Sequence, residues 1–346
     1  MKPYLTIISL SLFFFSCKEE HTAREVNNIE LEITKIDSTS IRSIHAISDK
    51  KVYFAGSNGK IGFTNDGGKT WNIETISFQD SIQPHFRSMV KTKEALFTLS
   101  IANPALLYKI DDSQKLVYTE NHEKVFYDSM KFFDNEIDGI AVGDPTDNCP
   151  SILITNDGGN SWSKVSCEKL PDFEDGEAFF AASNTNIKII NNTVWIASGG
   201  KKARILKSSD KGKTWSIHDT PIVQGNGPQG IYSIDFYDEN NGIIIGGDYS
   251  KPNDNFRNKA VTKDGGKTWE IIADNENPNY KSCVKYVPKS NGKEIFAVGK
   301  TGISYSNDAG KSWKNLSDEG FYAIDFVNEN TAWLSGNEKI AKLSVQ

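Results

Sequence analysis

The chain has 346 residues, which is long enough for two ordinary domains or for one closed array of repeats. Charged residues make up 24% of the chain and the formal net charge is −6, with lysines and arginines scattered among the acidic residues. Because nucleic-acid binding requires clustered basic residues, this distribution argues against a nucleic-acid partner.

Residues 1–17 have the pattern of a lipoprotein export signal. Lys2 supplies a positive charge, Leu5 to Phe15 form an apolar core, and the sequence FFSC ends at Cys17. The apolar run is too short to span a bilayer as a stable helix. We therefore expect cleavage before a lipidated Cys17 and a polar tether over residues 18–28, with an ordinary cleaved signal peptide as the alternative.

The remaining chain is organised around an eight-residue pattern that occurs five times. Its first copy is TNDGGKTW, Thr64 to Trp71, and every copy has a hydroxyl residue first, Asp third, Gly fifth, Ser or Thr seventh and Trp eighth. The copies start 91, 53, 54 and 44 residues apart, so the first gap holds about two repeats of one supersecondary unit.

Each copy is predicted to be a structural hairpin turn. Its Asp can accept hydrogen bonds from the turn, its glycines can adopt positive φ, and its Trp has enough apolar area to pack against a neighbouring unit. The residues concerned are Asp66, Trp71, Asp157, Trp162, Asp210, Trp215, Asp264, Trp269, Asp308 and Trp313.

This pattern resembles the Asp-box, also called the bacterial neuraminidase repeat. The surrounding sequence, from about Ile29 to Gln346, is most similar to β-propellers of the photosystem II stability and assembly factor type. The resemblance implies a β-propeller. Families with this box include sialidases, xyloglucan-cleaving hydrolases and non-catalytic scaffolds, so the resemblance indicates a fold rather than an activity.

Two more strands recur in each repeat. A short apolar strand ending in Gly or another small residue occurs seven times, from Val52–Gly56 to Ala332–Gly336, and an apolar segment with a small middle residue precedes each copy. Small side chains suit the innermost strands, which converge on the axis of a propeller. The predicted small residues are Ser43, Ser88, Ser129, Ala181, Ser233, Ser282 and Ala323.

We therefore predict an all-β fold over residues 29–346. It is a seven-bladed β-propeller with four-stranded blades, whose last blade is closed by the N-terminal strand Ile29–Asp37, so that no long sheet edge stays open. No stretch has sustained helical periodicity.

The cysteines suggest one disulfide. In the hairpin of the second box the turn is centred between Gly158 and Gly159, so directly opposed residues have numbers adding to about 317, and those of Cys149 and Cys167 add to 316. Opposed antiparallel residues are close enough for a disulfide. We predict this bond, with two buried free thiols as the alternative, and a single packed Cys283.

One face of the ring is the predicted binding surface. In such blades the inner strands begin, and the second strands end, on the face opposite the boxes, where the longest loops also lie. Polar and aromatic groups around a central channel make this face the default binding site, with a solvated rim as the alternative. Its residues are Arg42, Arg87, Asp128, Asp144, Phe180, Tyr232, Asp248, Lys281, Lys300, Tyr322 and Asn337.

A catalytic site is the second hypothesis for this face. Sialidases use three arginines, a Tyr–Glu nucleophile and an Asp, but this chain has only five arginines and lacks their Phe/Tyr-Arg-Ile-Pro motif. Other glycosidases need two opposed carboxylates. The candidate catalytic residues are Arg42, Arg87, Asp128, Asp144, Tyr232 and Tyr322, with Glu177 and Asp248 as further carboxylates.

No metal or cofactor is expected. The five histidines are far apart in sequence, and each box offers a single carboxylate where calcium loops need several. Gly225 to Gly230 match G-x-G-x-x-G but lead into a strand, so no dinucleotide site is predicted.

The sequence thus favours a monomeric lipoprotein. The residues after Cys17 resemble a surface-export signal of Bacteroidota-type lipoproteins, so we expect the chain at the outer membrane or cell surface. The preferred function is a non-catalytic binding or assembly scaffold for a protein or glycan partner. The alternatives are a sialidase-like glycoside hydrolase, a glycan-binding relic of one and, less favoured, a redox protein.

Overall fold

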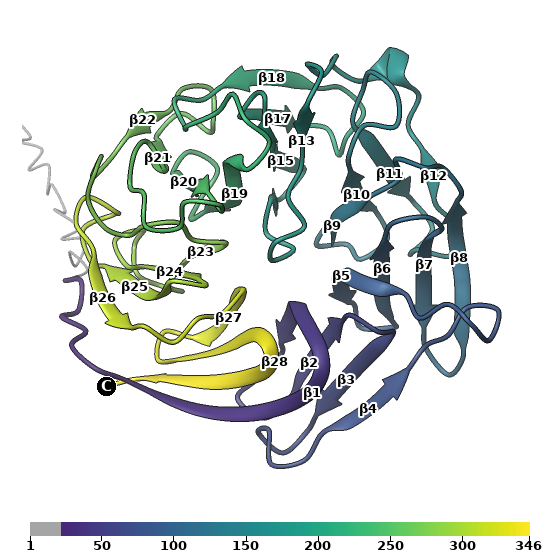
Figure 1. The fold of residues 1–346 in the computed structure, drawn as a ribbon, viewed down its shortest axis with the longest axis horizontal. Helices are drawn as coiled ribbons and strands as arrows, with labels where there is room; N and C mark the ends of the chain where they lie inside the picture. Colours follow the sequence, from purple (N-terminus) through teal and green to yellow (C-terminus); the bar gives the residue numbers. More distant parts are fainter. Residues whose placement is uncertain (1–21) are drawn as a thin grey trace, which may run out of the picture.

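The computed structural model describes residues 22–346, which form an all-β ring around a central axis (Figure 1). The expected signal peptide, Cys17 and the first residues of the tether lie outside the described residues. Within residues 22–346 no helix is long and apolar enough to cross a membrane. The one helix of this range is the short 3-10 turn η1, Cys167–Lys169.

Four sheets have four strands each. In spatial order they are β5 (His85–Lys91), β6 (Leu96–Ile101), β7 (Ala105–Ile110) and β8 (Gln114–Glu120); β9 (Tyr127–Phe132), β10 (Gly139–Gly143), β11 (Ser151–Thr155) and β12 (Ser163–Lys164); β14 (Ile187–Ile190), β15 (Thr193–Ala197), β17 (Arg204–Ser208) and β18 (Ser216–Asp219); β23 (Cys283–Tyr286), β24 (Ile295–Gly299), β25 (Gly302–Ser306) and β26 (Lys314–Ser317).

Two sheets have six strands each. The first contains β27 (Ala323–Asn328), β28 (Thr331–Val345), β1 (Ile29–Ala46), β2 (Val52–Gly56), β3 (Lys60–Thr64) and β4 (Asn72–Thr75). The second contains β13 (Glu177–Ala178), β16 (Gly199–Gly200), β19 (Gln229–Phe236), β20 (Gly242–Asp248), β21 (Lys259–Thr262) and β22 (Glu270–Ile271).

The predicted count of seven blades is wrong. Counted as hydrogen-bonded sheets, the propeller has six blades. The difference arises at the chain termini, because β1 runs without interruption for 18 residues. Its first half pairs with β28 and its second half with β2, so the strands expected to form a separate closing blade lie in one sheet with those expected to form the first.

The two ends of the chain close the ring through β1 and β28. Ile29 pairs with Val345, and the antiparallel register continues without a break to Lys35 opposite Lys339. Thr22 to Asn28, expected to belong to the tether, also contact the propeller: Val26 is buried, and the Arg24 guanidinium lies 2.7 Å from Glu294. The attachment of the chain to the ring therefore begins before Ile29.

Seven strands border the axis, since the fused terminal sheet contributes both β1 and β27. The others are β5, β9, β14, β19 and β23, and each contacts the next around the ring (Figure 1). Side chains of like register on these strands therefore meet at the axis.

Residues 179–186, here called the channel segment, cross the middle of this ring (Figure 1). The Asn184 amide nitrogen donates to Ser43 Oγ at 3.0 Å and to the Met89 carbonyl at 2.9 Å, and the Met130 N–H donates to Asn184 Oδ1 at 3.0 Å. One side chain thus joins β1, β5 and β9, so the channel segment fixes the inner strands to one another.

Two of the predicted inner positions are wrong. Ala181 belongs to the channel segment and not to an inner strand, because β14 begins only at Ile187. In β23 the residue at the predicted small position is Cys283, which pairs with Val298, and not Ser282. A one-residue shift reverses the face of a strand, so both corrections matter for the site.

Large aromatic side chains connect neighbouring sheets on the box face. Trp195 is fully buried, stacks on Phe236 with ring centroids 4.0 Å apart, and donates from Nε1 to the Gly265 carbonyl at 2.8 Å. Within the fused terminal sheet, Trp333 holds the equivalent place beneath the first box, where its ring packs edge-on against Trp71. On the outer side of the ring, Cys149 and Cys167 are joined by a disulfide, and Cys283 is a buried free thiol.

Candidate functional site

The central face opposite the boxes contains a cavity of about 550 Å³, here called the central-face pocket. Its walls come from the starts of inner strands, from the channel segment and from loops of the β19 and β23 sheets. Its lining residues include Arg42, Arg87, Asp144, Phe180, Tyr232, Tyr249, Tyr280, Lys300 and Tyr322.

Two arginines form the cationic side of the central-face pocket. The Arg42 guanidinium lies 3.8 Å from the centre of the Tyr322 ring, and its Nη1 donates to the Ala182 carbonyl at 3.3 Å. Burial lowers the pKa of Arg42, and burial together with the charge of Arg42 lowers the pKa of Arg87 to about 10. Both Nε atoms are buried and have no hydrogen-bond partner among the described residues.

Two carboxyl groups lie beside these arginines. Asp144 lines the central-face pocket and accepts a hydrogen bond of 2.7 Å from the Phe179 N–H, yet burial raises its pKa to about 6. Asp128 is fully buried beneath it, and neither of its carboxyl oxygens has a hydrogen-bond partner within residues 22–346. Burial and the neighbouring Asp144 raise the pKa of Asp128 against the opposing effect of Arg87.

Aromatic rings form the opposite wall of the central-face pocket. Phe180 and Tyr232 are stacked with centroids 4.0 Å apart, and Tyr232 meets Tyr280 edge-on at 4.9 Å. Lys300 donates to the Tyr249 carbonyl at 2.7 Å and lies over the Tyr280 ring. The pocket therefore combines flat apolar surfaces with three cationic side chains, which suits a ligand that has both a planar and an anionic part.

Seven of the eleven residues predicted for the binding face line this pocket, namely Arg42, Arg87, Asp144, Phe180, Tyr232, Lys300 and Tyr322. Asp128 lies beneath it. Lys281 is buried elsewhere, with its ammonium donating to Thr301 Oγ1 at 2.9 Å. Asp248 accepts from its own turn at Ser250, and Asn337 is exposed at the turn of β28.

Sequence reasoning missed Tyr280 and Ser282, which line the pocket from the start of β23. The signal was available in the register of β23. Ser43, Ser129, Ser233 and Ala323 each pair with the residue that precedes a Gly of the next strand. In the β23 sheet that Gly is Gly299, which makes Cys283 the equivalent position.

The carboxylates expected for a glycosidase are dispersed. Glu177 forms a buried ion pair with Arg204 at 2.5 Å, and the Glu177 Oε1 also accepts from Ser198 Oγ at 2.6 Å. Among Asp128, Asp144, Glu177 and Asp248, only Asp144 lines the central-face pocket. A two-carboxylate mechanism requires a second carboxylate on the opposite side of the substrate.

The five box turns are internally satisfied. In the first, Thr70 donates from its backbone N–H to Asp66 Oδ1 at 3.0 Å and from Oγ1 to Asp66 Oδ2 at 2.6 Å, while Thr64 Oγ1 donates to Oδ1 at 2.8 Å. The same arrangement recurs at Asp157, Asp210, Asp264 and Asp308. These carboxylates therefore hold their own turns.

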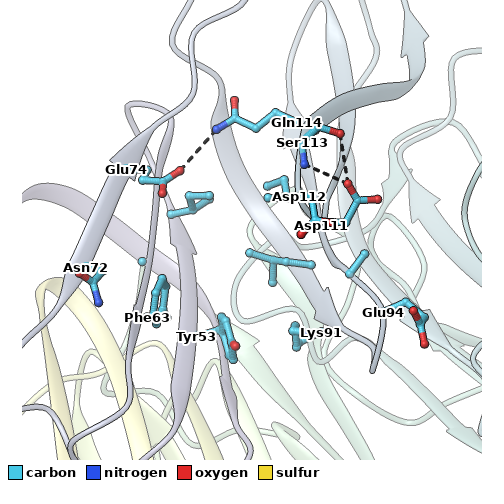
Figure 2. Close-up of a pocket in the computed structure, with 15 residues that line it drawn as sticks. Tyr53, Phe63, Asn72, Glu74, Lys91, Glu94, Asp111, Asp112, Ser113 and Gln114 are labelled. Carbon is cyan, nitrogen blue, oxygen red and sulfur yellow. Dashed lines mark hydrogen bonds between the residues drawn. The ribbon is translucent and has the colours of Figure 1, made fainter.

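Lateral grooves lie between neighbouring sheets. Figure 2 shows one of about 450 Å³, where Tyr53, Phe63 and Glu74 of the terminal sheet face Lys91 and Asp111 of the β5 sheet. The same space recurs between the β9 and β14 sheets and between the β19 and β23 sheets. Sheets that radiate from an axis leave such wedges between their outer strands, so the groove in Figure 2 is a feature of the fold rather than a distinct site.

No family model matches the chain. A curated relative, the photosystem II assembly lipoprotein Ycf48 of Synechococcus sp. (strain CC9902), is 24% identical over 270 residues, which cover 67% of this chain and 75% of the relative. This chain resembles Ycf48.

Solved structures extend the resemblance to the fold. YCF48 bound to a D1 peptide aligns with a TM-score of 0.65 at 16% identity and covers 94% of this chain and 100% of its own. YCF48 from Cyanidioschyzon merolae aligns at 0.62 with 14% identity, covering 90% of this chain and 98% of its own. The WD40 repeats of RRP9 align at 0.63 with 11% identity, covering 91% and 97%. The resemblance to assembly-factor propellers predicted from the sequence is confirmed, and the propeller fold is shared more widely.

Proposed function

We propose that this chain is a lipid-anchored, non-catalytic scaffold that binds a segment of a partner protein in the central-face pocket. The observation that carries the proposal is the pair Arg42 and Arg87, whose buried Nε groups have no partner among the described residues although they lie in a pocket walled by aromatic rings. Buried donors without partners are costly, and a ligand carboxylate would satisfy them.

Charge supports an anionic ligand group. The chain as a whole has a formal net charge of −6, yet the central-face pocket brings together Arg42, Arg87 and Lys300 against Asp144. A local positive site on an acidic protein attracts an anionic segment and discriminates against neutral ones. The rings of Tyr280 and Tyr322 give the residues beside that anionic group a flat surface to pack on.

The relatives support a scaffold role. Ycf48 is named as an assembly lipoprotein, and one YCF48 structure contains a D1 peptide. From these we take peptide binding and lipid anchoring through Cys17. The residues after Cys17 resemble a surface-export signal, so we place the partner at the outer membrane or cell surface and do not propose a photosystem.

The test compares peptide binding by the wild type with that of a double variant, Arg42→Gln with Arg87→Gln. The probe is an array of acidic nonapeptides carrying either a free or an amidated C-terminus, and the matched control is Arg257→Gln, an exposed arginine that does not line the pocket. We expect peptides that bind the wild type to bind the double variant at least tenfold more weakly, with the control unchanged. Equal binding by wild type and double variant would refute the proposal.

Glycan hydrolysis is the second candidate, since Asp144, with a pKa of about 6, lines the pocket and could act as an acid. Cleavage of fluorogenic glycosides by the wild type, the double variant and the control distinguishes the enzyme from the scaffold. Turnover that the wild type and the control show, but the double variant lacks, would establish an enzyme instead of a scaffold. Mass spectrometry of the mature N-terminus tests the anchor separately, because an unlipidated Cys17 would remove it.

A further inference from the structure

A second cavity lies on the axis at the opposite mouth, on the box face. Its volume is about 30 Å³, and the part of the channel segment from Ser183 to Thr185 separates it from the central-face pocket. Its ionisable lining residues are His45, Lys131, Lys285 and Asp325. We call it the box-face cavity.

These charged residues share one register. The channel-facing residues of the inner strands include Ser43, Ser129, Ser233, Cys283 and Ala323, and side chains two positions further along a strand lie on the same side. The residues at those positions are His45, Lys131, Asp235, Lys285 and Asp325, and Lys188 of β14 lies alongside as the ion-pair partner of Asp235. The fold thus concentrates ionisable groups at this mouth.

The carboxylates in this cluster are already engaged. Asp235 accepts from Lys188 Nζ at 2.6 Å and from the Tyr286 N–H at 2.8 Å. Asp325 accepts from the Ala46 N–H at 2.9 Å and lies 3.7 Å from the His45 ring nitrogen.

Two ammonium groups are not engaged in this way. Neither the Lys131 nor the Lys285 ammonium donates a hydrogen bond to a group in the described part of the chain, although both residues line the box-face cavity. The cluster therefore contains three lysines, including Lys188, and the two aspartates Asp235 and Asp325. It carries one positive charge in excess. Burial lowers the pKa of His45, so the imidazole adds no charge at neutral pH.

We propose that the box-face cavity binds one small inorganic anion, of the size of chloride, between the ammonium groups of Lys131 and Lys285. An anion there would receive the hydrogen bonds that these lysines do not give to protein groups and would neutralise the excess charge. The volume limits the ligand: a cavity needs roughly 10 to 15 Å³ for one water molecule, so about 30 Å³ holds one small ion and excludes sugars, nucleotides and organic acids.

Binding should depend on pH through Lys131. Burial and the charges of Lys285 and Lys188 lower the pKa of Lys131 to about 8, against the effect of Asp325. Burial also disfavours the charge on Lys285, but Asp235 and Asp325 outweigh it and raise the pKa of Lys285. A bound anion favours protonated Lys131, so affinity falls as the pH rises through about 8.

The test is thermal unfolding of the full chain at constant ionic strength, with sodium chloride replacing sodium gluconate, whose anion is too large for the cavity. We expect chloride to raise Tm by about 2 °C with saturation. Lys131→Met and Lys285→Met keep side-chain length but remove the charge, and either should abolish the chloride effect. Lys115→Met, on an exposed strand, should retain it.

Crystals soaked in bromide give an independent readout that does not depend on the stability of a variant. An anomalous peak in the box-face cavity of the wild type, lost in Lys285→Met, supports the proposal. A wild type with equal Tm in chloride and gluconate and no bromide peak in the cavity would overturn it, as would a chloride effect that persists in both lysine variants.

Discussion

The box turns and the central-face pocket both contain carboxylates beside hydroxyl or cationic groups. Hydrogen bonds lower the pKa of the carboxylates in the turns, whereas burial raises the pKa of the carboxyl group in the pocket. In the first box, the hydrogen bonds from Thr70 and then Thr64 lower the pKa of Asp66 to about 2. In the pocket, burial raises the pKa of Asp144 to about 6, and the Nε groups of Arg42 and Arg87 have no protein partner among the described residues. Polar groups that satisfy one another support the fold, whereas groups held apart in a buried pocket remain available to a ligand.

The largest expected effect lies beneath the boxes. Trp195→Ala removes a fully buried ring that stacks on Phe236 and donates to the Gly265 carbonyl, so the free energy of unfolding should fall by about 3 to 5 kcal/mol. Urea denaturation measures the change. Phe256→Ala, at an aromatic side chain that is 47% exposed, is the control and should cost under about 1 kcal/mol. Similar losses in both variants would mean that the tryptophan is not a main contact between sheets.

The features that sequence reasoning placed well are those fixed by local pattern. The Asp66 turn is determined by eight consecutive residues, and the pairing of Cys149 with Cys167 follows from the symmetry of one hairpin about its turn. Their position at the start of inner strands also placed Arg42 and Arg87 on the face opposite the boxes, where the structure brings them together. Such features depend on period and turn chemistry alone.

The features that sequence reasoning misplaced depend on contacts between residues that are far apart in the chain. The blade count failed because the continuity of β1 is decided by hydrogen bonds to β28 at the other end of the chain. The channel segment has no local signature: Asn184 is one asparagine in a loop until β1, β5 and β9 surround it. In β23, the one-residue error in register assigned Lys281 to the binding face in place of Ser282, which lines the pocket.

The pH dependence of stability tests this comparison at the central-face pocket. The pKa of Asp144 is raised in the folded chain, so between about pH 4 and 6 the native state binds more protons than the unfolded state. Stability contributed by this carboxyl is therefore present at low pH and lost as the pH rises through about 6. Asp144→Asn should gain on the wild type across this window by on the order of 3 kcal/mol, measured by urea denaturation at each pH. Parallel stability curves for the two proteins would show that Asp144 is not perturbed.

The box carboxylates should show the opposite slope and the smallest effect. Hydrogen bonds from Thr214 and Ser208 outweigh desolvation and lower the pKa of Asp210 to about 2, so its contribution to stability is present above about pH 4 and is lost as the pH falls toward 2. Because the turn is exposed, screening should hold the cost of Asp210→Asn below about 1 kcal/mol at neutral pH. The same denaturation series measures it. Relative to the wild type, Asp210→Asn should lose stability as the pH rises from about 2 to 4, whereas Asp144→Asn should gain stability as the pH rises from about 4 to 6. If both variants changed with pH in the same direction, the two sites would not differ in how they hold their carboxylates, and the distinction between turns that support the fold and a pocket that binds would lose its electrostatic basis.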